Sequence, residues 1–415
     1  MILKNVLQRH YKLPLGPQVA GFCKWLKKRK YKVSTIDSHV SYLSSFNEYL
    51  NELGILNFKN LNLECIDLFF SDYLPRLVSS RKLSPRYPIH VRSALNCFIE
   101  YFEEKHSLEL CSKPFPSYQS LLDEHQGWLK DYHNLSQATL DHHKYYLIPF
   151  LDYLGCDVEK ERLLSLSCRE VQTFFLDYCN SASKAVRRKM QAALRSFFRF
   201  CIYQGYTEND LSKAVPTIRT YKLDRVPHGI EEEQVQHLLS SINRNTDAGR
   251  RDYAIIQILH TYGVRGGQIS KLCINDINWE QNQIRFRALK AGKESIFPLT
   301  DDVGISLLDY LQNSRPKVPY PEVFLVARAP YSPLHHAGAL SSKIAQRIRI
   351  AGIKSTGSGT HIFRHAFASR MLKNGNSLKD IADMIGHRSI TTTFIYTKVD
   401  FQSLDQVPLN WLEEE

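Results

Sequence analysis

Six polar residues in the second half of the chain stand in an order that suggests joint chemistry. Taken alone, each has an ordinary explanation. An arginine after a helix can cap its carbonyls, a lysine in a turn is normally solvated, His and Arg three residues apart can simply share a helix face, and a tyrosine between Ile395 and Thr397 is more often part of a core. Together they offer two guanidiniums, a phenol and three groups that can carry protons. They are Arg265 in YGVRGGQ, Lys290 in ALKAGKE, His361 and Arg364 in HIFRH, His387 in IGH, and Tyr396 in FIYTKV.

This combination of side chains suits the cleavage of a phosphodiester bond. Two guanidiniums bind phosphoryl oxygens bidentately and stay protonated at any working pH, so they can neutralise charge without a metal. The phenol of Tyr396 can attack phosphorus and form a covalent link that stores the bond energy. Lys290 can protonate the departing 5′-oxygen, His361 can accept the Tyr396 proton, and His387 can hydrogen-bond a phosphate oxygen. The sequence has no DxD, HExxH or GxxxxGK[ST] motif, which agrees with a reaction that needs neither metal nor ATP.

The same residues resemble the signature of the tyrosine recombinase family, the phage-integrase-like site-specific DNA recombinases. That signature is an Arg, a Lys on a β-hairpin, a His-x-x-Arg pair, and a Gly-His before a Tyr. Here Lys290 follows Arg265 by 25 residues, and Tyr396 follows His387 by nine. The strings KAGKESIFPL, HIFRHAFASRML and IADMIGHRSITTTFIYTKV also fit. The resemblance covers about residues 228–400 and, more weakly, the segment from about 117 to 220, which looks like the family's core-binding domain.

The resemblance implies an enzyme that cuts, exchanges and rejoins DNA strands through a 3′-phosphotyrosine, for the integration, excision or transposition of a mobile element. It implies that the six residues are catalytic, with Tyr396 as the nucleophile, and that no metal or other cofactor is needed. The implied partner is double-stranded DNA at specific sites, enclosed by a C-shaped clamp. A homo-tetramer would act on two synapsed sites through a Holliday junction, alone or with companion recombinases.

The C-terminal residues VDFQSLDQVPLNWLEEE are amphipathic around Val407, Leu409, Trp411 and Leu412. Members of the family commonly dock such a tail on a neighbouring subunit. The alternative is a tail that folds back on its own domain.

Three features depart from the family pattern. Gln268 stands where the family often has Glu after Arg-x-Ser; it can orient Arg265 by hydrogen bonding but supplies no carboxylate. Lys293 competes with Lys290 for the lysine role, and Lys290 is preferred because the first Lys of Lys-x-x-Lys aligns with the family's catalytic one. Residues 1–112 are not part of the family's minimal plan.

The local pattern predicts the elements that position these residues. IEEEQVQHLLSSI and GRRDYAIIQILHTYG indicate helices. QIRFRAL alternates Ile284, Phe286 and Ala288 with Arg285 and Arg287, and ESIFPLT follows the KAGK turn, which predicts a short β-hairpin. Helices are expected from there to the end. SLKDIADMI is expected to open with a capping box between Ser377 and Asp380.

The first half of the chain contains a duplication. The segment that begins at Trp25 matches the one that begins at Trp128, and Tyr49-Leu50 matches Tyr153-Leu154. LECIDLFFSDYL then matches LSCREVQTFFLDYC, and VRSALNCFIEYF matches MQAALRSFFRFC, in the same order. Each copy is expected to form about four helices, and the two prolines of CSKPFPS mark the joint between the copies.

Basic residues occur at equivalent places in both copies. Although a run of charges is often only a solvated face, the repetition favours contact with DNA phosphates. In the second copy, Ala193, Leu194, Phe197 and Phe198 are expected to form the core face of the helix that carries them. The candidate DNA-binding residues are Arg76, Arg81, Lys82, Arg86 and Arg92 in the first copy, and Lys184, Arg187, Arg188, Arg195 and Arg199 in the second.

Composition limits the class of protein. The 415 residues carry 54 Lys and Arg against 42 Asp and Glu, so the net charge is +12, which favours a polyanionic partner. No apolar run is long enough to span a membrane, and the N-terminus lacks a secretion signal. The nine cysteines are odd in number and form no CxxC pair, so they are expected to be buried thiols in a reducing compartment. A cytoplasmic, nucleoid-associated protein is expected.

The predicted fold is mainly α, with two tandem helical DNA-binding units before a mostly helical catalytic domain that contains a small antiparallel sheet. The expected domains are residues 1–112, a duplicate of the core-binding unit; 113–222, the core-binding unit; and 223–415, the catalytic domain with its tail. TYKLDRVPHG is the expected linker between the last two. Two alternatives stay open: a type IB topoisomerase that only relaxes DNA, and a non-catalytic DNA-binding accessory protein on the same fold.

Overall fold

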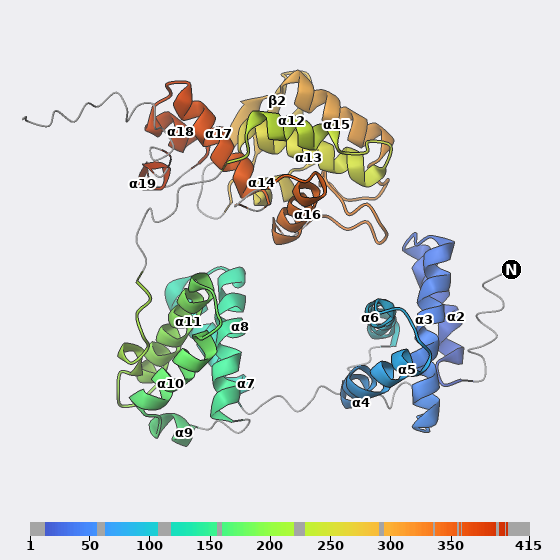
Figure 1. Cartoon of the computed structure of the whole chain (residues 1–415), viewed down its shortest axis with the longest axis vertical. Helices are drawn as coiled ribbons and strands as arrows, with labels where there is room; N and C mark the ends of the chain where they lie inside the picture. The colour runs from blue at the N-terminus through green and yellow to red at the C-terminus, as the bar shows by residue number, and fades with distance from the viewer. Residues whose placement is uncertain are drawn as a thin grey trace, which may run out of the picture. The chain divides into compact units, whose positions relative to one another are not determined.

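The computed structural model of the chain is built mainly from helices (Figure 1). It describes residues 13–55, 63–106, 118–155, 160–219, 229–289, 294–334, 337–354, 357, 359–386, 390–394 and 396. The expected fold class, mainly helical with one small antiparallel sheet, is confirmed. Among these residues, no helix combines the length and the apolar character that crossing a membrane requires.

The chain separates into two compact units, residues 3–19 with 41–222 and residues 20–40 with 223–415. The finer division into three domains stays a prediction. Residues 220–228 of the expected linker and the whole proline-rich joint CSKPFPS lie outside the described residues.

The helices of the first copy bury the predicted apolar face. On the second of them, Ile36, Val40, Leu43 and Phe46 are all buried. The ring of Phe46 meets that of Phe69 edge-on, with 5.0 Å between their centroids. The elements are α2 (Gly16–Lys28), α3 (Val33–Glu52), α4 (Leu63–Leu68), the π-helix η2 (Phe69–Tyr73), α5 (Leu74–Ser80) and α6 (Tyr87–His106).

The helices of the second copy pack around a separate aromatic core. The predicted core face of its last long helix is confirmed, because Ala193, Leu194, Phe197 and Phe198 are buried. Phe198 contacts Phe150 of the second helix, with 5.6 Å between ring centroids. The duplication itself stays a prediction. The elements are α7 (Gln119–His133), α8 (Gln137–Leu154), α9 (Lys160–Leu164), α10 (Cys168–Cys179), α11 (Lys184–Tyr203) and the 3-10 helix η3 (Leu211–Lys213).

Residues from 229 onward form a larger core around one central helix, α13. This helix buries Ile255, Ile256, Ile258 and Leu259, and it contacts both α15 and α17. Burial on several sides agrees with the run YAIIQIL in the second half of the helix, in which Gln257 is the one polar residue. The helices are α12 (Glu232–Ser240), α13 (Asp247–Tyr262), α14 (Gly266–Ser270), the 3-10 helix η4 (Ile274–Asp276), α15 (Asp301–Asn313), α16 (Ala337–Ile350), α17 (His361–Lys373), α18 (Leu378–Met384) and α19 (Ile390–Thr393).

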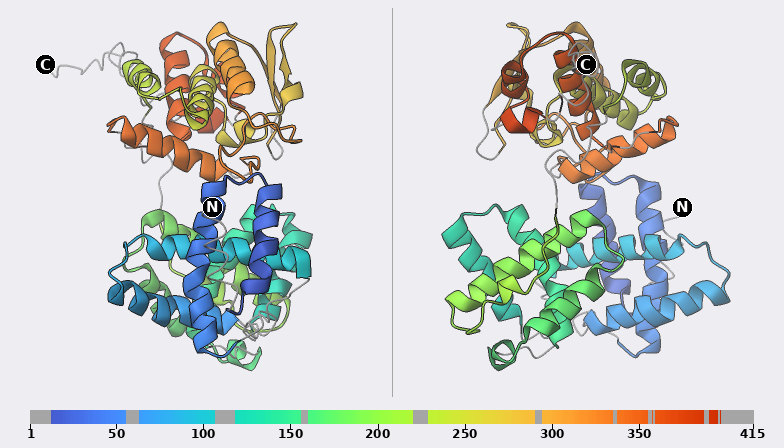
Figure 2. Two further views of the ribbon diagram at one scale, coloured as in Figure 1. Left: turned by 90° about the vertical axis from the view of Figure 1, so that its right-hand side faces the viewer. Right: turned by 60° about the vertical axis from the view of Figure 1, so that its left-hand side comes forward.

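A three-stranded antiparallel sheet stands beside these helices (Figure 2). The strands are β1 (Ile277–Asn278), β2 (Gln283–Phe286) and β3 (Ser295–Pro298), in the order β1-β2-β3. The predicted hairpin is β2–β3, in which Ile284 pairs with Phe297 and Phe286 with Ser295. The predicted alternation ends at Phe286, because the strand stops there and Ala288 is exposed.

Two arginines, one on β2 and one just after it, share one buried carboxylate. Asp276 in η4 accepts from Arg285 Nη2 at 3.0 Å and from Arg287 Nε at 3.1 Å. Asp276 also accepts from the amide of Cys273 at 2.9 Å. The side chain of Asp276 is fully buried while both guanidiniums are half exposed, so it fixes the strand that leads into the KAGK turn.

Helix α18 begins after Ser377, as predicted, and one of the two hydrogen bonds of the expected capping box forms there. Ser377 Oγ accepts from the amide of Asp380 at 3.1 Å. The hydroxyl of Ser377 also donates to the Asp380 carboxylate at 2.6 Å. The cap fixes the start of the helix whose end reaches the active-site arginines described below.

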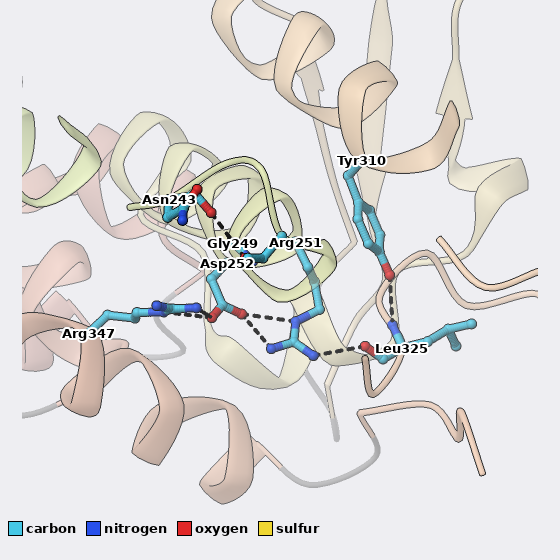
Figure 3. A network of polar contacts seen from close by, with 8 residues as sticks. Asn243, Gly249, Arg251, Asp252, Tyr310, Leu325 and Arg347 are labelled. Atoms are coloured by element: carbon cyan, nitrogen blue, oxygen red, sulfur yellow. Dashed lines mark hydrogen bonds and ion pairs between the residues drawn. The ribbon is translucent and has the colours of Figure 1, made fainter. Parts of the chain in front are cut away.

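A buried ion-pair network joins α13 to α16 (Figure 3). The carboxylate of Asp252 accepts from Arg251 Nε at 2.9 Å and from Arg347 Nε at 2.8 Å. Arg251 Nη1 also donates to the Leu325 carbonyl oxygen at 3.1 Å, and the amide of Leu325 donates to the hydroxyl of Tyr310 at 3.3 Å. The side chains of Arg251 and Asp252 are only 3% and 5% exposed, so both charges depend on this pairing.

The described cysteines are not all buried as expected. Cys23, Cys97, Cys179 and Cys201 are buried. Cys168 is exposed because it is the first residue of α10, directly after the N-cap residue Ser167.

Candidate active site

Arg265 lies between α13 and α14, where two glycines allow the chain to pass closely over α17. Gly263 ends α13 with φ +59°, and a Cβ there would lie 2.7 Å from the Phe367 side chain. A Cβ at Gly266 would lie 2.9 Å from Thr360 Oγ1. Only glycine fits these positions without displacing α17, so the YGVRGG sequence holds Arg265 against that helix.

Gln268 orients the backbone at Arg265. Its Oε1 accepts from the amide of Arg265 at 3.1 Å, and its Nε2 donates to the Arg287 carbonyl oxygen at 3.4 Å. The expected hydrogen bond therefore forms with the main chain of Arg265, while the guanidinium projects elsewhere. Through Arg287, the same glutamine connects Arg265 to the chain just after β2.

The guanidiniums of Arg265 and Arg364 meet at the end of α18. Arg265 donates from Nη1 to the Ile385 carbonyl oxygen at 3.3 Å and from Nη2 to that of Gly386 at 2.9 Å. Arg364 donates from Nη2 to the same Ile385 oxygen and from Nη1 to the Gly263 carbonyl oxygen at 3.1 Å. One oxygen is thus shared by two cationic groups that lie far apart in the sequence.

The two arginines form a concentrated positive site. Arg364 is only 4% exposed, and burial together with the nearby Arg265 lowers its pKa to about 10. Burial also lowers the pKa of Arg265, while the neighbouring Tyr396 acts in the opposite direction. Because a pKa of about 10 still leaves Arg364 protonated at neutral pH, the site keeps its charge and favours an anionic ligand.

Tyr396 is buried beside this arginine pair. Its side chain is 2% exposed and packs with Phe367, Ile381 and Ile385. Its hydroxyl contacts His365 Nδ1 at 3.0 Å. Burial raises the pKa of the Tyr396 phenol, and the charges of Arg364 and Arg265 oppose that rise.

His361 lies at the first position of α17 and is exposed. Partial burial and the charges of Arg364 and Arg265 lower its pKa, which favours the neutral imidazole. The histidine that touches the Tyr396 hydroxyl is His365, one turn further along the helix. The role of His361 as proton acceptor stays a prediction.

The remaining predicted active-site residues lie outside the described part of the chain. Lys290 and its rival Lys293 fall between β2 and β3, and His387 directly follows Gly386. The C-terminal tail from residue 397 is outside it as well. In the sequence, the two lysines are flanked by the strands β2 and β3, and His387 follows the end of α18.

The basic residues of the first copy differ in what they contact. Arg76 pairs with Asp72, and Arg81 Nη2 lies 3.1 Å from Glu48 Oε2. Arg92 lies over the Phe70 ring, 4.0 Å from its centroid. All five predicted side chains are exposed, including those of Lys82 and Arg86.

In the second copy, four of the five predicted basic residues share one face of α11, because their spacing follows the helical repeat. Arg187 lies beside that face, and its Nε donates to the Ala182 carbonyl oxygen at 2.9 Å. Arg195 Nη2 donates to the Val215 carbonyl oxygen at 2.9 Å and to Thr217 Oγ1 at 2.7 Å. The four residues on the shared face are Lys184, Arg188, Arg195 and Arg199.

A cavity of about 510 Å³ adjoins this face near the end of α11. Its lining combines three cationic side chains with one carboxylate, so it is suited to an anion. The lining residues are Arg195, Arg199, Ile202, Asp210, Ser212 and Lys213.

Comparison with known proteins gives a consistent set of relatives. The family model described as the Phage integrase family matches residues 229–403. The integrase/recombinase y4rA of Sinorhizobium fredii is 31% identical over 398 residues, which are 96% of this chain and 95% of the relative. The tyrosine recombinase XerD of Listeria innocua is 30% identical over 236 residues, which are 54% of this chain and 76% of XerD.

A solved structure shows the same fold. It is the XerH site-specific recombinase bound to its palindromic difH substrate in a post-cleavage complex. The similarity covers 76% of this chain and 87% of XerH, with a TM-score of 0.54 and 19% sequence identity.

Proposed function

Because this chain belongs to the phage integrase family of tyrosine recombinases, enzymes that cleave and rejoin DNA strands, we propose that it exchanges strands between specific DNA sites through a 3′-phosphotyrosine intermediate. The reaction needs neither metal nor ATP, and it serves the integration, excision or transposition of a mobile element. Tyr396 is the nucleophile, and the other five predicted residues assist it.

The convergence of Arg265 and Arg364 on the Ile385 carbonyl oxygen supports this proposal most directly. Two guanidiniums that share one oxygen can bind the non-bridging oxygens of a phosphodiester in the same way. Their charge would then stabilise the additional negative charge of the transition state. Tyr396 packs with Ile385, whose carbonyl oxygen both arginines bind, which supports a nucleophile beside the phosphate site.

The proposed reaction moves two protons. The Tyr396 oxygen forms a bond to phosphorus and passes its proton to a histidine of the HIFRH segment, while the bond from phosphorus to the 5′-oxygen breaks. Lys290 protonates that 5′-oxygen, and His387 donates a hydrogen bond to a non-bridging oxygen. Rejoining is the reverse reaction, in which the 5′-hydroxyl of the partner strand attacks and the phenolate leaves.

The described site must rearrange before this reaction. Tyr396 is almost fully buried, and the arginine donors that a phosphate would use are bound to the Ile385 and Gly386 carbonyls. DNA binding therefore has to displace this turn. That displacement is the step that activates the enzyme.

Assembly on DNA is also part of the proposal. XerH was solved on its DNA substrate, which supports a DNA-bound assembly for this chain. We propose a tetramer on two synapsed sites, with both helical copies of the first half touching DNA.

The test is to trap the covalent intermediate. A nicked substrate that loses its 5′-hydroxyl fragment after cleavage prevents rejoining, so wild-type protein should accumulate a protein–DNA adduct. Tyr396→Phe removes only the hydroxyl and should bind the same DNA without forming an adduct. An adduct at the wild-type level in that variant would remove Tyr396 from the mechanism.

The same assay separates the alternatives. A non-catalytic accessory protein would form no adduct in the wild-type form. A type IB topoisomerase would form an adduct and relax supercoiled DNA, but it would not exchange partners between two sites. A two-site recombination assay run beside a relaxation assay distinguishes these outcomes.

A further inference from the structure

The hydroxyl of the proposed nucleophile has a partner that the motif comparison did not assign. His365 Nδ1 lies 3.0 Å from Tyr396 Oη, which is a hydrogen-bonding distance. The two rings are packed together, with 5.7 Å between their centroids and 56° between their planes. His361, by contrast, has no contact with this hydroxyl among the hydrogen bonds of the described residues.

The surroundings of His365 favour a neutral imidazole that can accept a proton. Burial and then the charges of His361 and Arg364, both on α17, lower the pKa of His365. From α14, Arg265 lies near the same phenol, and from α18 the neighbouring side chains are the apolar Ile381 and Ile385.

The titratable group that faces α17 from α13 is His260. It contacts Arg370, with 3.5 Å from its Nδ1 to Arg370 Nη1. Its other ring nitrogen lies 3.3 Å from a carboxylate oxygen of Glu232. This second cluster therefore meets α17 at Arg370, more than one turn beyond His365.

We propose that His365 keeps its contact with Tyr396 when the Ile385–Gly386 turn is displaced, and that it is the general base that takes the Tyr396 proton during DNA cleavage. This inference rests on the proposed function. As the Tyr396 oxygen bonds to phosphorus, its proton passes to His365 Nδ1, and the electrons of the breaking bond leave with the 5′-oxygen, which Lys290 protonates. Bond formation makes the phenol far more acidic, so a weakly basic imidazole is sufficient at that moment. On rejoining, the His365 imidazolium returns the proton to the departing phenolate.

Two substitutions separate proton transfer from simple positioning. In His365→Asn, the amide oxygen can occupy roughly the place of Nδ1 and keep the hydrogen bond, but it cannot take up the proton. His365→Ala removes both functions. The matched control is His237→Asn on α12, because His237 is exposed and its ring contacts the Ala351 carbonyl oxygen, far in sequence from the proposed site.

The experiment measures single-turnover adduct formation on the nicked substrate between about pH 5 and 9, with the full-length protein. DNA affinity and thermal unfolding are measured beside it, so that a variant that fails to fold is recognised. The general-base role predicts that both His365 variants lose about 100-fold or more in cleavage rate with nearly unchanged DNA affinity. Added imidazole should restore part of the His365→Ala rate, in proportion to its unprotonated fraction.

The pH profile supplies a readout that a structural role would not change. His365 must be neutral to accept a proton, and its pKa lies below the ordinary 6.5. The wild-type rate should therefore fall as the pH drops through that lowered pKa. His365→Asn should lose this acidic decline, whereas His361→Asn should keep it.

Three outcomes would decide the question. A His365→Asn variant that cleaves within about threefold of the wild-type rate would overturn the general-base role, since a hydrogen bond alone would then suffice. Loss of the acidic decline in His361→Asn alone would overturn it in favour of His361. If the wild-type protein forms no adduct at all, the proposed function fails first, and that result is distinct from a failure of His365.

Discussion

At the residue scale, Lys290 and Lys293 compete for the role of general acid. The acid matters only when the leaving atom needs a proton, and a 5′-sulfur leaves without one. Lys290→Ala should therefore slow cleavage of an ordinary 5′-oxygen substrate by about 100-fold or more, and cleave a 5′-phosphorothiolate at close to the wild-type rate. Single-turnover cleavage of the two substrates measures the difference.

Lys293→Ala is the matched control, because the lysine lies three residues away in the same KAGK turn. It should slow both substrates equally or not at all. Rescue by sulfur in Lys293→Ala, without rescue in Lys290→Ala, would move the acid three residues along the chain.

Sequence reasoning identified the arginine pair but not the contact of the nucleophile. The His-x-x-Arg spacing selected His361 and Arg364, and the structure brings Arg364 and Arg265 together at Ile385. His365 was within the quoted HIFRH string. In the sequence, His365 is marked only by its position one turn after His361. That position does not reveal its contact with Tyr396, which lies 31 residues further along the chain.

At the element scale, the Asp252 network holds α13 and α16 together, and it leads to a stability prediction. Asp252→Asn removes the carboxylate but leaves the guanidinium of Arg251, 3% exposed, without its counter-charge. Breaking one partner of a buried ion pair typically costs about 3–5 kcal/mol, so the free energy of unfolding should fall by about that amount. Urea denaturation followed by circular dichroism measures it.

Asp309→Asn provides the comparison, because Asp309 also carries two arginine partners, Arg244 and Arg250, but lies nearer the surface. Exposed pairs contribute about 0–1 kcal/mol, so this loss should be much smaller. Equal losses in the two variants would mean that burial of the Asp252 network adds nothing to stability.

Helix starts and strands were predicted well where the sequence signal lies within a few neighbouring residues. The β-hairpin followed from alternation and a turn, and the start of α18 followed from a serine cap. The Asp252–Arg347 pair was beyond such reasoning, since its partners are 95 residues apart. The carboxylate of Asp276, which fixes β2, was missed because its arginine partners looked like the solvated face of a strand.

At the scale of the whole molecule, the question is which basic residues touch DNA. Arg188 and Arg199 are exposed on the shared face of α11, whereas Arg187 is bound to main-chain carbonyls. Each lost phosphate contact lowers the slope of log K against log salt by about 0.9. Arg188→Gln with Arg199→Gln should therefore reduce that slope by about 1.8. Arg187→Gln should leave the slope almost unchanged.

The first copy allows the parallel measurement. Lys82→Gln with Arg86→Gln in the full-length chain should reduce the salt slope by a similar amount if this copy also touches phosphates. The competing view is that residues 1–112 contact a neighbouring recombinase. On that view, the salt slope would be unchanged while synapsis of two sites would fail, which titrations and a synapsis assay on one DNA can separate.

The turn at Ile385 and Gly386 has a consequence for the cell. Its two carbonyls act as a tethered ligand for the guanidiniums of Arg265 and Arg364. A tethered group competes at an effective concentration of about millimolar or higher. Free phosphate would have to overcome this competitor with the arginine pair alone, whereas a DNA duplex adds contacts along its whole length. If the arginine pair is the phosphate site, we expect dissolved oxyanions to inhibit the enzyme only weakly, because they compete with the turn without the further contacts that DNA makes.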